Sequence, residues 1–240
     1  MTYSVIVLCG GLGSRLSKIE SIKVKILAPI GSKLFIDYFL RWFEINKGVK
    51  QDMIFAMGFN SKLLEEYIQK KFLKIKFNVE KSQKGTLPAV IESVSLANYD
   101  DILVLNGDTI FNVNFDQMYS KYKSDSNNPL LAVKSLQKDN KFNQSGYLLS
   151  NDKHLNFVDS NSDLISCGAF FTKKTNINKE LLNEDQWNNC EKFDLDLNYL
   201  SKAKSKPYFC GNEYMLDIGT PENFYAAQKY IPKYVPFENE

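Results

Sequence analysis

Three glycines and an arginine directly follow the first apolar run and form the sharpest chemical signal in the chain. Residues 8–16 read Leu-Cys-Gly-Gly-Leu-Gly-Ser-Arg-Leu. Gly10, Gly11 and Gly13 allow a tight turn and a close backbone approach, so their amides can point at phosphate oxygens. Arg15 adds a fixed cation with several donors. We expect an anion-binding loop that fits neither the P-loop nor the dinucleotide pattern; a plain turn is the alternative.

One lysine and two aspartates could complete a phosphate site. Lys25 follows in residues 23–29, where Lys23 is equally available by composition. Asp108 closely follows the apolar run 101–105, as the last residue of the sequence Asn-Gly-Asp. Asp217 lies within the apolar stretch 214–219. Ligands collect at the carboxyl ends of strands in open α/β sheets, where carboxylates can hold Mg²⁺ together with phosphate oxygens. The two aspartates could therefore share one metal ion, although each could instead cap a turn or a helix.

Alternating strand and helix patterns must position these residues. Apolar runs at 4–8, 53–57, 75–79 and 101–105 predict strands, and helical spacing predicts helices at 34–45, 61–72 and 88–97. This alternation is typical of a parallel sheet covered on both faces. In the second half we expect strands at 130–133, 146–149 and 169–172, and helices at 193–200 and 221–230. Thr220 and Pro221 form a helix start, and 124–128 and 159–163 are expected loops.

Composition excludes several classes of function. The 240 residues are 44% hydrophobic and 24% charged, with 30 Lys+Arg against 28 Asp+Glu. A net charge of +2 favours neither nucleic acid nor an acidic membrane as a partner. His154 is the one histidine, and the four cysteines form no C-x-x-C pair, which disfavours a zinc site. We expect a cytoplasmic protein, since we see no signal peptide, no membrane-length apolar run and only scattered cysteines.

The motifs, taken in order, resemble those of the sugar-nucleotidyltransferases, or nucleoside-diphospho-sugar pyrophosphorylases. Residues 8–16 match L-x-G-G-x-G-[ST]-R-L, and residues 25–30 match the P-K-P-[LM]-x-P-[IV] segment. Residues 80–86 carry E-K and G-T, residues 105–109 match L-N-G-D-T, and residues 217–223 match D-I-G-[TV]-P-E-[DN]. The resemblance covers nearly the whole chain. It points most closely to the branch that makes GDP-D-glycero-D-manno-heptose, next to the mannose-1-phosphate guanylyltransferases.

This resemblance implies a single-domain α/β fold over residues 1–240, the nucleotide-diphospho-sugar transferase fold: a Rossmann-like mixed, mostly parallel sheet flanked by helices. Residues 1–115 would bind nucleotide and residues 116–240 sugar phosphate. The implied reaction is NTP + sugar 1-phosphate → NDP-sugar + pyrophosphate, with Mg²⁺ as cofactor. GTP and a heptose or mannose 1-phosphate are the implied substrates, for surface polysaccharide synthesis.

The resemblance also implies roles for individual residues. The catalytic group comprises Arg15, Lys25 and Asp108, and the Mg²⁺ ligands are Asp108 and Asp217. The nucleotide contacts are Leu8, Gly10, Gly11, Gly13, Glu80, Gly85 and Thr86. The sugar-phosphate contacts are Asn106, Cys167, Gly168, Asp194 and Asp196.

The chain departs from the family pattern in both halves, and the first half is the better match. Val24 and Ile26 replace the prolines beside Lys25, and residues 87–88 are Leu-Pro where the family has small residues. The family's second E-K pair becomes Phe-Val-Asp-Ser at residues 157–160, which lacks the lysine. Lys134 ends the apolar run 130–133 and is the nearest candidate to replace that cation; a solvated lysine is the alternative.

Two other functions remain open. One is transfer of a uridylyl, thymidylyl or cytidylyl group to another phosphate. The other is a non-catalytic nucleotide-sugar-binding or regulatory protein. A homo-oligomer is also left open.

Overall fold

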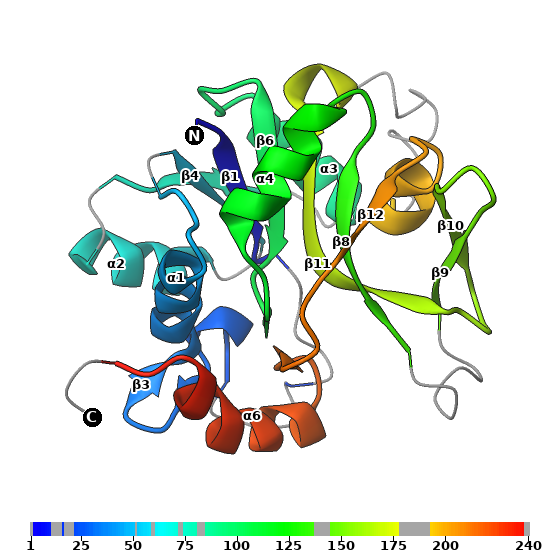
Figure 1. Cartoon of the computed structure of the whole chain (residues 1–240). Helices are drawn as coiled ribbons and strands as arrows, with labels where there is room; N and C mark the ends of the chain where they lie inside the picture. The colour runs from blue at the N-terminus through cyan, green and yellow to red at the C-terminus, as the bar shows by residue number, and fades with distance from the viewer. Residues whose placement is uncertain are drawn as a thin grey trace.

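The computed structural model describes residues 2–10, 16, 22–50, 52–58, 61–71, 74–80, 85–136, 145–177 and 193–237. Within these ranges, nine strands form one sheet in the order β10-β9-β11-β6-β1-β4-β5, with β8 paired to β11 and β12 paired to β8 (Figure 1). The first-half strands are parallel: β1 (Ser4–Leu8), β4 (Met53–Met57), β5 (Lys76–Val79) and β6 (Asp101–Asn106). All four were predicted, and the mixed α/β fold is confirmed.

The second half extends this sheet through antiparallel pairing. β11 (Leu164–Lys173) runs antiparallel to β6 and joins β8 (Leu130–Ser135) and β9 (Gly146–Leu149). β10 (Leu155–Val158) pairs with β9, and β12 (Lys206–Phe209) runs parallel to β8. β11 is much longer than the predicted strand 169–172. Its polar interruption at Ser166 coincides with a register shift before Phe170, which hid the strand's first part from the apolar pattern.

Helices cover both faces of the sheet, as Figure 1 shows. One face packs against apolar residues of α1 (Phe35–Ile45), α2 (Ser61–Lys71), α4 (Phe115–Ser124) and α6 (Pro221–Tyr234). The other packs against α3 (Thr86–Val94) and the short π-helix Asp196–Leu200. Val5 and Val7 face the first core and Ile6 the second, which explains why β1 is apolar along its length.

The helix boundaries follow local capping chemistry. Thr220 accepts a hydrogen bond from the Asn223 backbone N–H at 3.2 Å, and Pro221 occupies the first position of α6, as predicted. α3 begins at Thr86 rather than at residue 88, so Pro88 lies in its first turn, where a missing N–H is tolerated. α4 was not predicted, although Phe115, Met118, Tyr119 and Tyr122 have helical spacing and are buried.

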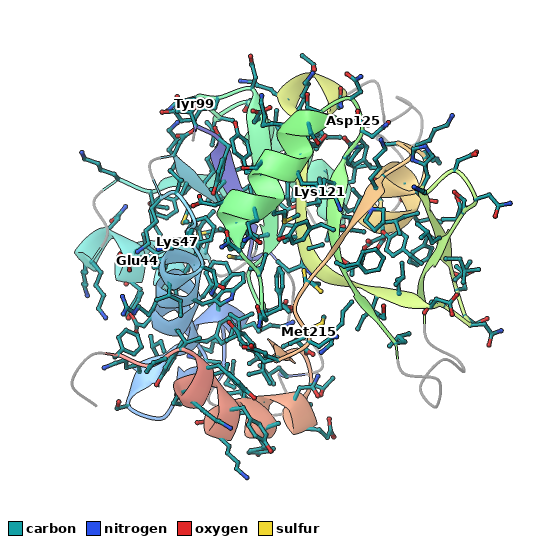
Figure 2. The ribbon with its side chains drawn as sticks, viewed as in Figure 1. Glu44, Lys47, Tyr99, Lys121, Asp125 and Met215 are labelled. Atoms are coloured by element: carbon teal, nitrogen blue, oxygen red, sulfur yellow. The ribbon has the colours of Figure 1, made fainter. Side chains whose placement is uncertain are left out.

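Several short elements complete the fold. The 3₁₀ helix Lys25–Leu27 leads into the hairpin of β2 (Pro29–Ile30) and β3 (Lys33–Leu34). β7 (Thr109–Phe111) pairs antiparallel with β13 (Met215–Asp217), and a second 3₁₀ turn spans Lys174–Asn176. Figure 2 shows Met215 of β13 at the opposite end of the molecule from Tyr99, which precedes β6. In the ranges given above, no helix combines the length and apolar character that a membrane crossing requires.

Candidate active site

The carboxyl ends of the parallel strands bring the predicted nucleotide residues together. Leu8 pairs in register with Asn106, and its carbonyl accepts a hydrogen bond from the Gly107 N–H at 2.9 Å. A Cβ on Gly107 would lie 2.8 Å from both the Leu8 carbonyl oxygen and the Cys9 Sγ atom, so the two strand ends pack tightly. Gly10 follows at the same edge. The predicted residues Gly11, Gly13 and Arg15 lie outside the described residues.

Lys25 reaches this edge and pairs with Asp108. The Lys25 Nζ atom donates to the Asp108 Oδ2 atom at 2.7 Å, and the two side chains are 19% and 29% exposed. Ile26 is buried, so the residue in place of a family proline anchors the loop in the core. Lys23 is exposed. The structure thus distinguishes the two lysines that composition alone could not.

Asp217 lies beside Asp108 because β13 pairs with β7. Asp217 is in register with Thr109, and the Ile218 N–H donates to the Asp108 carbonyl oxygen at 3.0 Å. The Asp217 carboxylate accepts hydrogen bonds from the Gly219 N–H at 2.8 Å and from the Asn223 side-chain amide at 2.7 Å. The motif Asp-Ile-Gly-Thr-Pro-Glu-Asn contained Asn223, but its contact with Asp217 was not foreseen.

These two carboxylates fit the ligand chemistry of Mg²⁺. Both supply hard oxygen atoms, which Mg²⁺ prefers. Across the residues with described positions, no group of three or more His, Cys, Asp or Glu side chains could hold a metal ion. A metal at Asp108 and Asp217 would therefore need oxygens from substrate and water, which is how Mg²⁺ commonly binds beside phosphates.

Glu80 presents a third carboxyl group of the site, which lies against Gly10. It follows β5, and its N–H donates to the Met57 carbonyl oxygen at 2.9 Å. A Cβ on Gly10 would lie 2.5 Å from the Glu80 Oε2 atom, so the carboxyl group lies directly against the Gly10 backbone. Burial, followed by the nearby charge of Glu92, raises the pKa of Glu80 to about 7. A half-buried carboxyl group beside the strand ends is well placed to meet polar N–H groups of a ligand.

The predicted nucleotide and sugar residues meet where α3 begins. Gly85 forms a bridge to Phe193, and its φ of +102° and close approach to that backbone leave no room for a side chain. The Thr86 hydroxyl accepts a hydrogen bond from the Leu195 N–H at 3.0 Å. Leu87 is fully buried, so its bulk faces the core.

Asp194 and Asp196 have distinct local partners. The Asp194 carboxylate accepts hydrogen bonds from the N–H groups of Asp196 and Leu197 at 2.9 and 3.1 Å, which makes it a cap for the π-helix. Asp196 accepts a hydrogen bond from the Tyr147 hydroxyl, and burial raises its pKa. Tyr147 was not predicted, because no local pattern indicates a contact that spans 49 positions.

Gly168 and Asn106 form another tight contact at this edge. Gly168 has a φ of +78°, and a Cβ there would lie 2.7 Å from the Asn106 Nδ2 atom. Asn106 itself is exposed. The Cys167 side chain is 1% exposed, and its hydrogen bond with Cys210 raises the pKa of the Cys210 thiol. Cys167 could therefore meet a sugar phosphate through its backbone only.

Lys134 lies near the end of β8, and its Nζ atom reaches the Asn212 carbonyl oxygen at 3.5 Å. This weak contact with a neutral carbonyl group leaves its ammonium group able to meet an anion. A cavity of about 640 Å³ lies elsewhere, at the amino end of β6, lined by residues that include Asn98, Asp101 and Lys123. None of its lining residues belongs to the predicted site.

Known proteins resemble this chain in both sequence and structure. The sequence model of the Nucleotidyl transferase family matches residues 4–233. A D-glycero-alpha-D-manno-heptose 1-phosphate guanylyltransferase from Campylobacter jejuni is 32% identical over 227 residues, covering 92% of this chain and 96% of that protein. A protein of the same name from Aneurinibacillus thermoaerophilus is 27% identical over 239 residues, covering 96% and 99% respectively. The crystal structure of HddC from Yersinia pseudotuberculosis has a TM-score of 0.76 at 22% identity, over 95% of this chain and 98% of that one, which supports the fold.

Proposed function

This chain belongs to the nucleotidyl transferase family, and from that premise we propose that it transfers a guanylyl group from GTP to a heptose 1-phosphate. The products are a GDP-heptose and pyrophosphate. Two relatives that align over more than nine-tenths of the chain carry this activity in their names. The observation that carries the proposal is the meeting of Lys25, Asp108 and Asp217 beside the strand ends that hold Leu8 and Gly10.

The chemistry needs positioning and charge stabilisation more than proton transfer. An oxygen of the sugar phosphate attacks the α-phosphorus of GTP, and the bond from that phosphorus to the bridging oxygen of the leaving pyrophosphate breaks. The attacking oxygen is already anionic, so no general base is required. Lys25 donates hydrogen bonds to the phosphates and stabilises the charge that develops in the transition state, as we expect of Arg15 too. Asp108 and Asp217 would hold Mg²⁺, which would neutralise phosphate charge.

Glu80 supports guanine as the base. A carboxylate accepts two N–H donors side by side, and the Watson–Crick edge of guanine presents N1–H and an amino group in that arrangement. Adenine, uracil and thymine each present fewer adjacent donors on this edge. Glu80 lies against Gly10 at the strand ends, which supports the proposal that its carboxyl group selects guanine.

On the acceptor side, we propose that Asn106 and Gly168 bind beside the sugar phosphate, with Lys134 supplying a cation. Asp196 and its partner Tyr147 then meet sugar hydroxyl groups. The missing lysine at residues 157–160 favours a second candidate, a nucleotide-sugar-binding protein without catalysis. The set of Lys25, Asp108 and Asp217 argues for the enzyme, since binding alone does not need a metal site.

Cys9, Cys167 and Cys210 are free, which supports a cytoplasmic location.

A pyrophosphate-release assay tests the proposal. Four nucleoside triphosphates are each combined with heptose 1-phosphate, mannose 1-phosphate and glucose 1-phosphate, in the presence of Mg²⁺. We expect the highest kcat/KM for GTP with heptose 1-phosphate. A higher kcat/KM with another base would refute the assignment of Glu80, and no release with any pair would favour the binding protein.

A further inference from the structure

The two aspartates of the candidate metal site already have partners in this chain. The Asp108 Oδ2 atom accepts from the Lys25 Nζ atom at 2.7 Å, and its Oδ1 atom accepts from the Thr109 hydroxyl at 2.8 Å. The Asp217 Oδ1 and Oδ2 atoms accept from the Gly219 N–H and the Asn223 amide at 2.8 and 2.7 Å. Each carboxylate oxygen therefore receives a hydrogen bond from a described residue. Only one of the four donors, the Lys25 ammonium group, carries a positive charge.

The Lys25 ammonium group, which is bound to Asp108, competes directly with a divalent cation for this carboxylate. Both need the same negatively charged oxygen, and the pair is only partly exposed, so their mutual repulsion is weakly screened. A phosphate group would remove the conflict, because it offers Lys25 new anionic oxygens and offers the metal further ligands.

We infer that Lys25 is the counter-ion of Asp108 in the free protein and leaves it for a phosphate when nucleotide binds. The metal site at Asp108 and Asp217 therefore becomes available only when nucleotide binds, so the metal ion and the nucleotide bind together. This inference rests on the proposed assignment of Asp108 and Asp217 to the metal.

The backbone around Lys25 is held while its side chain can turn. The Leu27 N–H donates to the Val24 carbonyl oxygen, and the Ala28 N–H donates to that of Lys25, both at 2.9 Å. Farther along, the Gln228 side-chain amide of α6 donates to the Pro29 carbonyl oxygen at 2.6 Å and accepts from the Gly31 N–H at 3.0 Å. These bonds fix the start of a four-carbon side chain, whose end can exchange one anion for another without movement of the loop.

Binding of Mn²⁺, used as a probe for Mg²⁺ and measured by electron paramagnetic resonance, tests this inference without any turnover. The whole chain is titrated in the absence of nucleotide as wild type, Lys25→Met and Lys23→Met. Lys23 is the matched control, because it is exposed and lies two positions away. We expect Lys25→Met to bind Mn²⁺ about tenfold more tightly than wild type, and Lys23→Met to match wild type.

The second part of the test repeats the Mn²⁺ titration with a non-hydrolysable GTP analogue that has a methylene bridge between the α- and β-phosphates. The analogue should tighten Mn²⁺ binding strongly in wild type and much less in Lys25→Met. Lys25→Gln repeats the test with a polar side chain, and circular dichroism checks the folding of each variant. Equal Mn²⁺ affinity of wild type and both Lys25 variants without nucleotide would overturn the inference. That outcome is distinct from failure of the guanylyltransferase proposal, which would appear as absent pyrophosphate release while the Mn²⁺ difference persists.

Discussion

Replacing Glu80 by glutamine should separate its role in nucleotide selection from its effect on stability. In the folded protein, burial and Glu92 raise the pKa of this carboxyl group from 4.5 to about 7. The raised pKa means that ionised Glu80 disfavours the folded state. Its contribution to stability is therefore complete below pH 4.5 and is lost as pH rises through about 7.

The size of this effect follows from the two pKa values. Their difference corresponds to an upper bound of about 3.4 kcal/mol in the free energy of unfolding. Because Glu80 is only half-buried, solvent screening reduces the expected loss to about 1–2 kcal/mol at pH 8. Glu80→Gln carries no charge, so it should match wild type at pH 4.5 and exceed it by that amount at pH 8.

Urea unfolding of wild type, Glu80→Gln and the exposed control Glu66→Gln between pH 4.5 and 8.5 measures this difference. The same Glu80→Gln variant should raise the KM for GTP by about ten- to a hundredfold, because it loses a charge-assisted hydrogen bond. Its preference for GTP over ATP should also fall. A stability difference that stays constant with pH would refute the assigned environment of Glu80, and an unchanged KM for GTP would refute its contact with the base.

Three further substitutions probe the metal, the sheet edge and the acceptor. Asp108→Asn should lower kcat by about 100- to 1,000-fold with a native circular dichroism spectrum, since the amide keeps the shape of the carboxylate and loses its charge; turnover is measured at limiting Mg²⁺. Gly168→Ala should lower the free energy of unfolding by about 1–3 kcal/mol because of its φ of +78° and the contact with Asn106. In urea unfolding, Gly31→Ala is its control, since Gly31 has a φ of +58° and open space around the added methyl group. Lys134→Ala should raise the KM for sugar phosphate by about ten- to a hundredfold and leave the KM for GTP unchanged in steady-state kinetics.

Each of these expectations has a contradicting result. Near-normal turnover of Asp108→Asn would exclude a shared metal site. Equal losses of stability in Gly168→Ala and Gly31→Ala would mean that the contact with Asn106 costs nothing. An unchanged sugar-phosphate KM in Lys134→Ala would remove that lysine from the acceptor site.

Local patterns in the sequence predicted the parts of the fold that local physics determines. The four parallel strands are continuous apolar runs because they are buried on both faces, and Thr220 and Pro221 cap α6 through contacts within one turn. β11 was only partly predicted, since its polar residues at the register shift break the apolar run.

The site depended on contacts that no local pattern contains. Lys25 and Asp108 are 83 positions apart, and local spacing gave no reason to prefer Lys25 over Lys23. Asp217 reaches Asp108 through the pairing of β7 with β13. The apolar runs placed both aspartates at strand ends, but no sequence pattern predicted that these two strands pair. Two other hydrogen bonds, from Tyr147 to Asp196 and from Leu195 to Thr86, join residues far apart in the sequence with no shared motif. They can therefore be found only in the folded chain.

Tracing labelled phosphate from GTP tests the central claim most directly. The 240-residue chain is incubated with heptose 1-phosphate, Mg²⁺ and GTP labelled with ³²P at either the α- or the γ-position, and the products are separated by ion-exchange chromatography. The proposed reaction places the α-label in a GDP-heptose and the γ-label in pyrophosphate, both dependent on the sugar phosphate. An α-label found in GMP or GDP alone, or a γ-label released as inorganic phosphate without the acceptor, would contradict guanylyl transfer.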